Sequence, residues 1–177
     1  SALTAWAEGG GQLKIVDGGY PEGSNSGSQS CSGTDWSYDK DTRTLTLSPT
    51  TPTNYDFSNN GIHTGPGNNT DCNLIIGQHA TVTDGFFWGA VTNHGTITGG
   101  LFSSSVSNES EGKIENGTFE STVTNNGTIK GGIFQKKPEG GTVASGYTLN
   151  VNFPKNGSYE SFDTGISYFG NSGYVIP

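Results

Sequence analysis

Residues 91–102 read VTNHGTITGGLF, and residues 123–134 read VTNNGTIKGGIF. A less similar version of the pattern, VSNESEGKIENGTF, lies between them at residues 106–119. A catalytic site is normally written once in a chain, whereas a unit that stacks on copies of itself is written repeatedly. The repetition therefore predicts a stacked, repetitive fold.

Four consecutive segments align on their apolar residues, at 76–90, 91–105, 106–122 and 123–137, and the third carries two extra residues. The spacing of the apolar residues within a segment matches neither a helix nor a long alternating strand. It predicts short strands, each with its central side chain inward, in a three-sided solenoid rung of about 15 residues. The three apolar columns are Ile76, Val91, Val106 and Val123; Val82, Ile97, Ile114 and Ile129; and Phe87, Phe102, Phe119 and Phe134.

Two further columns occupy the predicted corners. One contains amide side chains, which tolerate left-handed backbone and can hydrogen-bond to their own kind above and below in a stack. The other contains glycines, which suit the positive φ of a sharp corner. The amide column is Gln78, Asn93, Asn108 and Asn125, and the glycine column is Gly85, Gly100, Gly117 and Gly132. Each copy is therefore predicted to be one rung of a parallel β-helix.

The flanking segments also indicate strands, so the predicted fold class is all-β: a short parallel β-helix or solenoid with β-rich capping segments. WSYDKDTRTLTLSP at 36–49 reads as a hairpin-like unit, and GYTLNVNF at 146–153 reads as a strand. Residues 57–67 resemble a degraded upstream rung. We expect an N-terminal β-rich cap at 1–56, β-helix repeats at 57–137, and a C-terminal β segment at 138–177 that is a cap or the start of a further module.

The composition is typical of short strands and tight turns, because only 29% of the residues are hydrophobic and 29 are glycine. The net charge of −8 disfavours nucleic acid and anionic membranes as partners, since both require a basic patch. No apolar run approaches the roughly 18 residues of a membrane span. The sequence has no methionine, which predicts a processed or excised chain. The triplet Ala5-Trp6-Ala7 marks a secretory cleavage site or belongs to an ordinary N-terminal segment.

The two cysteines, Cys31 and Cys72, are too few for a disulfide framework. Bridged to each other, they would stabilise the fold by about 4 kcal/mol in the chain-entropy model. The alternative is two free buried thiols. Neither cysteine has the spacing of a zinc site, so no metal or cofactor is expected.

The repeat offers little support for catalysis. Asp84 aligns with glycine or asparagine in the other rungs, so neighbouring rungs present no paired carboxylates at one level. Asp39 and Asp41 suit a turn better than general acid chemistry. The pattern therefore predicts that the protein is not an enzyme.

Two other kinds of site receive weak support from the sequence. His79 and His94 fall in one column of consecutive rungs, as surface side chains or as part of a metal site, and His63 lies upstream of both. Thr81 and Thr96 begin T-x-T motifs of the kind that flat ice-binding solenoids display. Charged residues interrupt this array in the later rungs, which disfavours ice binding.

Aromatic side chains are the best candidates for ligand binding. Trp88 follows the inward Phe87, so alternation predicts that Trp88 points outward, and Phe86 points outward by the same logic, as do Leu101 and Ile133 in its column. An exposed aromatic ring with polar neighbours is a platform for a sugar. The alternative is that such rings cover the solenoid ends and pack under loops.

The rungs, which read TNxGTIxGGxF, and the WSYDxxTxTLTL segment resemble repeat-containing β-helical cell-surface proteins of anaerobic gut bacteria. The resemblance covers residues 36–134. It implies a secreted protein, often anchored to the cell wall and often multi-domain, whose β-helical part is adhesive or carbohydrate-binding. It implies no catalytic residues, and the chain shows no LPxTG sorting signal.

The expected function is therefore that of a non-catalytic, secreted or cell-surface bacterial protein that serves as an adhesive or scaffold module. One alternative is a carbohydrate-binding module that uses exposed aromatic residues. A second is a degenerate polysaccharide-processing β-helix enzyme. The expected partners are glycans or surface components of a host or cell wall, and the oligomeric state stays open.

Overall fold

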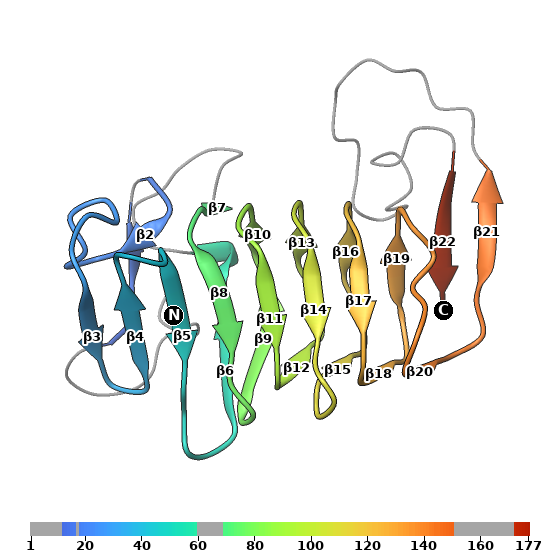
Figure 1. Ribbon diagram of the computed structural model, residues 1–177, viewed down its shortest axis with the longest axis horizontal. Helices are drawn as coiled ribbons and strands as arrows, with labels where there is room; N and C mark the ends of the chain where they lie inside the picture. The colour runs from blue at the N-terminus through green and yellow to red at the C-terminus, as the bar shows by residue number, and fades with distance from the viewer. Residues whose placement is uncertain (1–11, 17, 60–68, 151–171) are drawn as a thin grey trace.

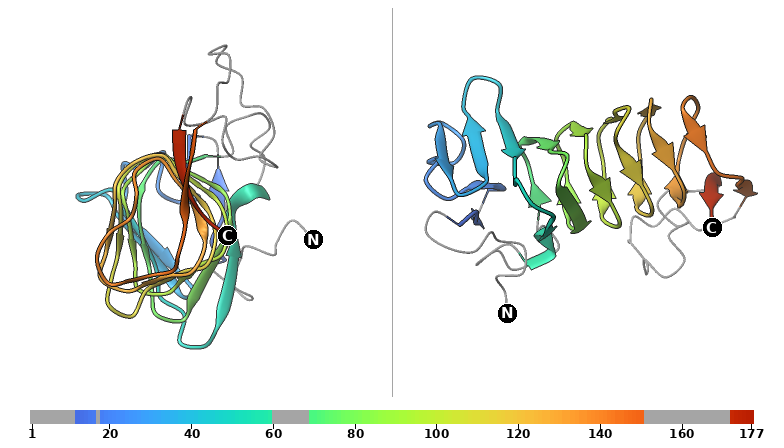
Figure 2. Two further views of the ribbon diagram at one scale, coloured as in Figure 1. Left: turned by 90° about the vertical axis from the view of Figure 1, so that its right-hand side faces the viewer. Right: turned by 90° about the horizontal axis from the view of Figure 1, so that it is seen from below.

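In the computed structural model, residues 12–16, 18–59, 69–150 and 172–177 are described. The chain forms parallel sheets wound as a β-solenoid of about four turns, which confirms the predicted all-β fold class (Figure 1). Three sheets, which we name wall 1, wall 2 and wall 3, enclose the core when seen along the axis (Figure 2). The one helical element in the described ranges is a 3₁₀ turn, η1 (Phe57–Asn59), and no helix there is long and apolar enough to cross a membrane.

Each rung contributes one short strand to each wall, in the order wall 1, wall 2, wall 3. Wall 1 contains β3 (Cys31–Gly33), β4 (Trp36–Asp39), β5 (Thr44–Leu47), β8 (Asn73–Ile76), β11 (Val91–Asn93), β14 (Val106–Asn108) and β17 (Val123–Asn125). Wall 2 contains β6 (Thr53–Asp56), β9 (Ala80–Asp84), β12 (Thr96–Ile97), β15 (Lys113–Ile114), β18 (Thr128–Ile129) and β20 (Thr142–Val143). Wall 3 contains β7 (Asn69–Thr70), β10 (Phe86–Phe87), β13 (Leu101–Phe102), β16 (Thr118–Phe119), β19 (Gly132–Phe134), β22 (Ser172–Ile176) and β21 (Tyr147–Asn150).

Inward side chains stack on their counterparts in the next rung, because parallel pairing holds the rungs in register. In wall 3 the rings of Phe87, Phe102, Phe119 and Phe134 stack with centroid separations of 4.8, 4.9 and 4.8 Å. Burial of each such side chain stabilises the fold by about 1.5–3 kcal/mol. The wall 2 ladder is Tyr55, Val82, Ile97, Ile114, Ile129 and Val143.

The wall 1 ladder differs from the sequence alignment in its first rung, where the alignment is wrong by two residues. Leu74 pairs with Val91, whereas Ile76 pairs with Asn93, so Gln78 has no place in the amide column. Leu74 and Ile76 are both apolar and lie two positions apart, so either choice keeps the same face inward. The complete ladder is Leu45, Leu74, Val91, Val106 and Val123.

The corrected register reveals that long and short rungs alternate. The rungs that start at Leu74 and Val106 are both two residues longer than the rung that starts at Val91. The extra residues form turns Gly77–Ala80 and Glu109–Gly112, closed by N–H···O bonds of 3.0 and 2.8 Å between their end residues. The structural period is thus a pair of rungs spanning 32 residues, which is the separation of the two similar stretches.

A buried amide ladder fills the corner between wall 1 and wall 2. Asn93 Nδ2 donates to Asn108 Oδ1, and Asn108 Nδ2 donates to Asn125 Oδ1, both at 2.8 Å. Asn125 Nδ2 donates to the Gly140 carbonyl at 2.8 Å, which ends the ladder on backbone. The Oδ1 of Asn93 also accepts from Gly95 N at 3.0 Å. The buried amides therefore satisfy one another and their own corner backbone.

Glycines make the corner between wall 2 and wall 3. Gly85, Gly100, Gly117 and Gly132 all have φ between 111° and 139°, a region that side chains rarely adopt. Asp84 Oδ1 accepts from Gly85 N at 2.8 Å, so this carboxylate supports the corner.

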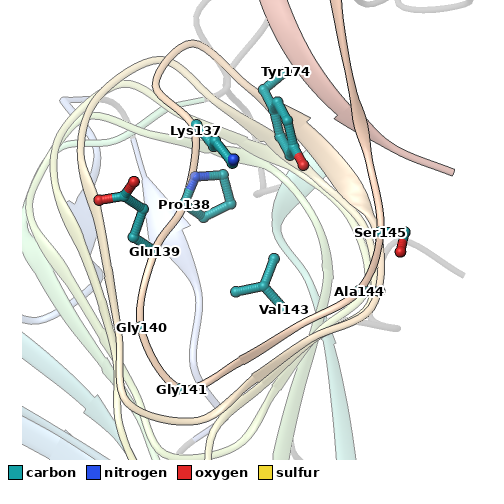
Figure 3. A pocket seen from close by; sticks show the side chains of 9 residues that line it. All are labelled: Lys137, Pro138, Glu139, Gly140, Gly141, Val143, Ala144, Ser145 and Tyr174. Carbon is teal, nitrogen blue, oxygen red and sulfur yellow. The ribbon is translucent and has the colours of Figure 1, made fainter.

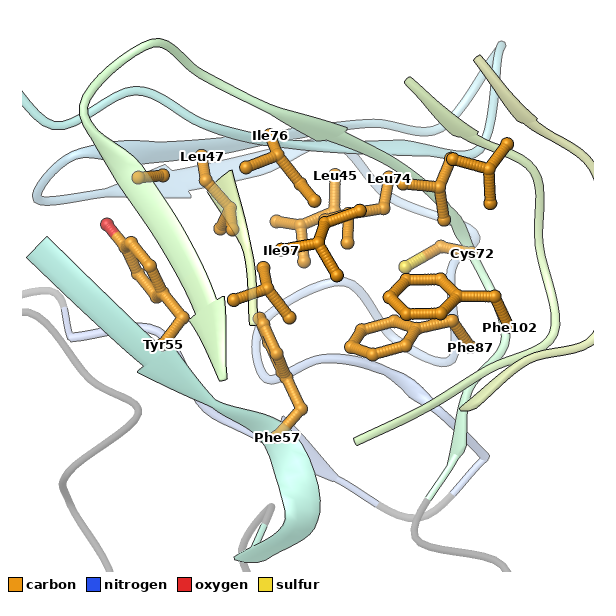
Figure 4. Close-up of a cluster of buried hydrophobic side chains, with 14 of the residues drawn as sticks. Leu45, Leu47, Tyr55, Phe57, Cys72, Leu74, Ile76, Phe87, Ile97 and Phe102 are labelled. Carbon is orange, nitrogen blue, oxygen red and sulfur yellow. The ribbon is translucent and has the colours of Figure 1, made fainter. Parts of the chain in front are cut away.

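The N-terminal cap continues wall 1 with antiparallel strands. β4 and β5 form the predicted hairpin, and β5 then pairs in parallel with β8, which joins the cap to the solenoid. β1 (Ile15–Val16) and β2 (Tyr20–Pro21) form a separate antiparallel pair. Tyr55 and Phe57 close the core at this end, where the Phe57 ring meets Phe87 edge-on at 5.5 Å (Figure 4).

The C-terminal cap combines a partial rung with two antiparallel strands. Residues 138–145 begin another rung, in which Val143 pairs with Ile129. β22 pairs antiparallel with β19, and β21 pairs antiparallel with β22 on wall 3. β21 accounts for the predicted strand at 146–153 as far as residue 150, and residues 151–153 lie outside the described ranges.

Cys31 and Cys72 are free thiols, so the disulfide alternative does not apply. Cys72 is buried, and this burial raises its pKa to about 12. Cys31 is partly exposed.

Candidate functional site

A row of side chains follows the corner where each rung passes from wall 3 to wall 1. Each member comes directly after the inward residue of a wall 3 strand, so the row advances by one residue per rung. Backbone bonds fix the row, because the N–H of each member after the first donates to a carbonyl of the preceding rung at 2.9–3.0 Å. We name Asp71, Trp88, Ser103, Glu120 and Gln135 the corner row.

Trp88 is the aromatic member of the corner row. Its side chain is 49% exposed, and the other exposed large hydrophobic residue of the described chain is Tyr147, at 50%. Gly89 follows, where an added Cβ would lie 2.3 Å from the Cys72 carbonyl oxygen, so only glycine fits. Gly89 and Ala90 place no bulky side chain after the indole, and the indole is available to a ligand.

Two polar members of the corner row hold each other in place. Ser103 Oγ donates to Glu120 Oε1 at 3.0 Å, which joins two successive rungs. Burial raises the pKa of the Glu120 carboxyl above its ordinary value, and the hydrogen bond from Ser103 opposes this rise. The carboxylate is therefore oriented before any ligand arrives.

Hydroxyl side chains surround the corner row on its wall 1 side. They are half-buried or exposed, and Lys136 Nζ donates to one of them, Thr122 Oγ1, at 3.3 Å. This surface can both donate and accept hydrogen bonds. Its hydroxyl residues are Ser104, Ser105, Ser121 and Thr122.

Phe86 lies apart from Trp88, on the outer face of wall 3. It is half-buried and pairs with Leu101, which pairs in turn with Thr118. Leu101, which was predicted to point outward, is only 6% exposed. Phe86 is thus less exposed than Trp88, which lies at the corner after wall 3.

The histidines are not brought together as the sequence alignment predicted. The N–H of His94 donates to Ile76 O, as the N–H of Gly77 donates to Leu47 O, so Gly77 and not His79 occupies the His94 column. His79 lies in the inserted turn. His94 Nδ1 instead hydrogen-bonds with the Glu111 carboxylate, and His63 lies outside the described residues.

The two acidic side chains of the hairpin turn, Asp39 and Asp41, serve the turn and an ion pair. Asp39 Oδ1 accepts from Asp41 N at 2.8 Å, and Asp41 pairs with Lys40 at 2.8 Å. No group of three His, Cys, Asp or Glu residues within the described ranges could hold a metal ion. In wall 2, Lys113 stands between Thr96 and Thr128, so a charge interrupts the threonine array.

A hollow of about 470 Å³ opens at the C-terminal end of the solenoid (Figure 3). Residues 137–141 and 143–145 line it, with Pro138 and Val143 among them, and Tyr174 lies at one side. Lys137 Nζ lies 5.5 Å from the centroid of the Tyr174 ring. The sequence analysis did not find this hollow, because it depends on where the partial rung stops.

The sequence analysis found Trp88 but missed its polar companions. The signal was available, since every corner-row residue follows a member of the phenylalanine column or its Thr70 counterpart. Reading the next position along that column gives Ser103 and Glu120.

Comparison of the chain with protein-family models, curated proteins and solved structures finds no match. The function is therefore inferred from the residues themselves.

Proposed function

We propose that this chain is a non-catalytic module of a secreted or cell-surface bacterial protein, and that it serves as an adhesive or scaffold. The observation that carries the proposal is that inward and outward side chains of the solenoid have separate roles. Stacked apolar and amide ladders hold the interior, so the outward positions are free to display polar side chains at fixed spacing. Asp39 and Asp84 also support this proposal, because their carboxylates accept hydrogen bonds from backbone N–H groups at a turn and a corner.

The test is a binding screen of the purified chain, with and without calcium, against plant and host-mucin glycans and against surface proteins of host and cell wall. The same glycans are then analysed for cleavage after long incubation. We expect a retained ligand and intact glycans. Shortened glycan products would contradict the non-catalytic assignment, and failure to retain any ligand would contradict the adhesive role.

The exposure of Trp88 favours a second candidate, a carbohydrate-binding module. An indole that is half exposed beside hydroxyl and carboxyl groups has the features of a sugar platform, because a pyranose ring stacks on the aromatic face while its hydroxyls need polar partners. Phe86 offers a poorer platform because it is half-buried.

Trp88→Ala tests this second candidate. We expect affinity for the glycan found in the screen to fall at least about 30-fold, as it does when an aromatic residue that the ligand covers is removed. Tyr147→Ala is the matched control, because Tyr147 is equally exposed but lies on β21, away from the corner row. Equal losses in the two variants would indicate a nonspecific aromatic contribution.

A further inference from the structure

We infer that the corner row binds a neutral, linear glycan laid along the solenoid axis, with successive sugars meeting successive rungs. The inference rests on the carbohydrate-binding candidate above and specifies its ligand. Three features of the row carry it: straightness, chemical order and preorganisation.

The corner row is straight because parallel pairing fixes its spacing. Phe86 and Phe87 pair with Leu101 and Phe102, and Phe102 pairs with Phe119, without a register shift. The row residues that follow them are therefore separated by the strand spacing of about 4.8 Å. From Asp71 to Gln135 the row spans roughly 19 Å at that spacing, which is longer than one sugar requires.

The chemical order of the row suits a chain rather than a single sugar. Trp88 supplies the stacking surface, while Ser103 and Glu120 supply hydrogen-bonding groups only on the next two rungs. A ligand stacked on Trp88 reaches them only if it continues along the axis. A ligand running across the axis would instead meet Gly89 and Ala90, which offer no polar side chains.

The residues of the corner row are also held in place before a ligand binds. Backbone bonds of 2.9–3.0 Å hold its residues, and the hydrogen bond between Ser103 and Glu120 orients the carboxylate. A ligand that meets fixed groups loses less binding free energy to ordering of the protein. Preorganisation along the row again favours a ligand that contacts several rungs.

Charge selects a neutral glycan. Asp71 and Glu120 stand on either side of Trp88 and Ser103, and Lys136, held on a neighbouring hydroxyl, supplies one opposing positive charge. The two carboxylates outnumber this cation, and the whole chain carries a net charge of −8. A polyuronic acid would bring further negative charge to this corner and be repelled. Carboxylates accept hydrogen bonds from the hydroxyls of a neutral sugar.

The experiment is calorimetric titration of the intact chain with cello-, xylo- and manno-oligosaccharides, each from disaccharide to hexasaccharide, and with oligogalacturonate. We expect affinity for at least one neutral series to rise with length to the tetra- or pentasaccharide and then level off, and oligogalacturonate to bind weakly. Glu120→Gln should weaken ligands from the trisaccharide upward about 2- to 10-fold and leave the disaccharide unchanged, whereas Ser103→Ala should weaken the disaccharide as well, because Ser103 lies one rung from Trp88. Thr92→Ala, on the outer face of wall 1, is the control.

The outcomes separate this inference from the candidate on which it rests. Binding that depends on Trp88 but not on chain length, Ser103 or Glu120 would overturn the axial arrangement and leave the carbohydrate-binding function standing. Tighter binding of oligogalacturonate would overturn the neutral-ligand assignment alone. No binding to any series by a natively folded chain would overturn both.

Discussion

Asn108 occupies the centre of the amide ladder, with its side chain bonded to Asn93 on one side and Asn125 on the other. Asn108→Ala would remove both amide–amide bonds of the ladder, and Asn93 Nδ2 and Asn125 Oδ1 would keep only their bonds to backbone, so we expect a loss of about 2–4 kcal/mol in unfolding free energy. Chemical denaturation measures this loss. Asn126→Ala removes an exposed amide next in the same corner and should be nearly neutral. Equal losses would mean that the buried ladder does not contribute specifically.

Glu111 should make stability depend on pH at a single residue. The hydrogen bond from Ser110 and then that from His94 lower the pKa of Glu111 to about 2. A folded pKa below the unfolded value of about 4.3 means that the stabilisation is present above that value and is lost as pH falls toward 2. Glu111→Gln should therefore melt slightly below the wild type at pH 5, with no difference near pH 2. The effect is small because the pair is exposed. A difference that persists at pH 2 would contradict this origin.

At the scale of elements, the phenylalanine stack in wall 3 is the longest aromatic feature. Phe102 lies between Phe87 and Phe119, with centroid separations of 4.8 and 4.9 Å, and is fully buried. Phe102→Ala should cost about 3–5 kcal/mol, because it opens a cavity between two rings that the backbone cannot close. Thermal and denaturant unfolding measure the cost. Phe86→Ala, at a half-buried position on the outer face, is the control and should cost less. The reverse order would contradict the register of wall 3.

The elements show how far the sequence could predict the fold. The wall 2 and wall 3 columns were readable because one apolar residue per strand lies between polar or glycine neighbours. The first member of the wall 1 column was predicted wrongly as Ile76 instead of Leu74, because both residues are apolar and lie on the same face of the strand. The turn Gly77–Ala80 was missed for the same reason, since shifting the alignment by two residues hid its two extra positions. The pairing of Ser103 with Glu120 was missed because it joins different rungs.

At the scale of the whole molecule, the pair of rungs is the unit that can be added or removed. A second copy of residues 91–122, inserted after residue 122, keeps the alternation of long and short rungs and every ladder in register. We expect a folded protein, at least as stable as the parent, that is longer by about two strand spacings, or roughly 9.6 Å. Circular dichroism melting and small-angle scattering check this. A duplication of residues 91–121, one residue short of the period, is the control and should fold poorly, because a one-residue shift turns inward side chains outward. If this variant folded as well as the 32-residue duplication, stability would not depend on keeping the ladders in register.

The two caps lie at opposite ends of the solenoid, and the main-chain bonds between rungs run along the line that joins them (Figure 1). A pulling force applied between the ends acts on these bonds in succession, because the outermost rung must peel away before the next one carries the load. Each peeled rung releases roughly 50 Å of extended chain. A chain loaded in this way lengthens in steps under tension and absorbs mechanical work, instead of breaking in a single event.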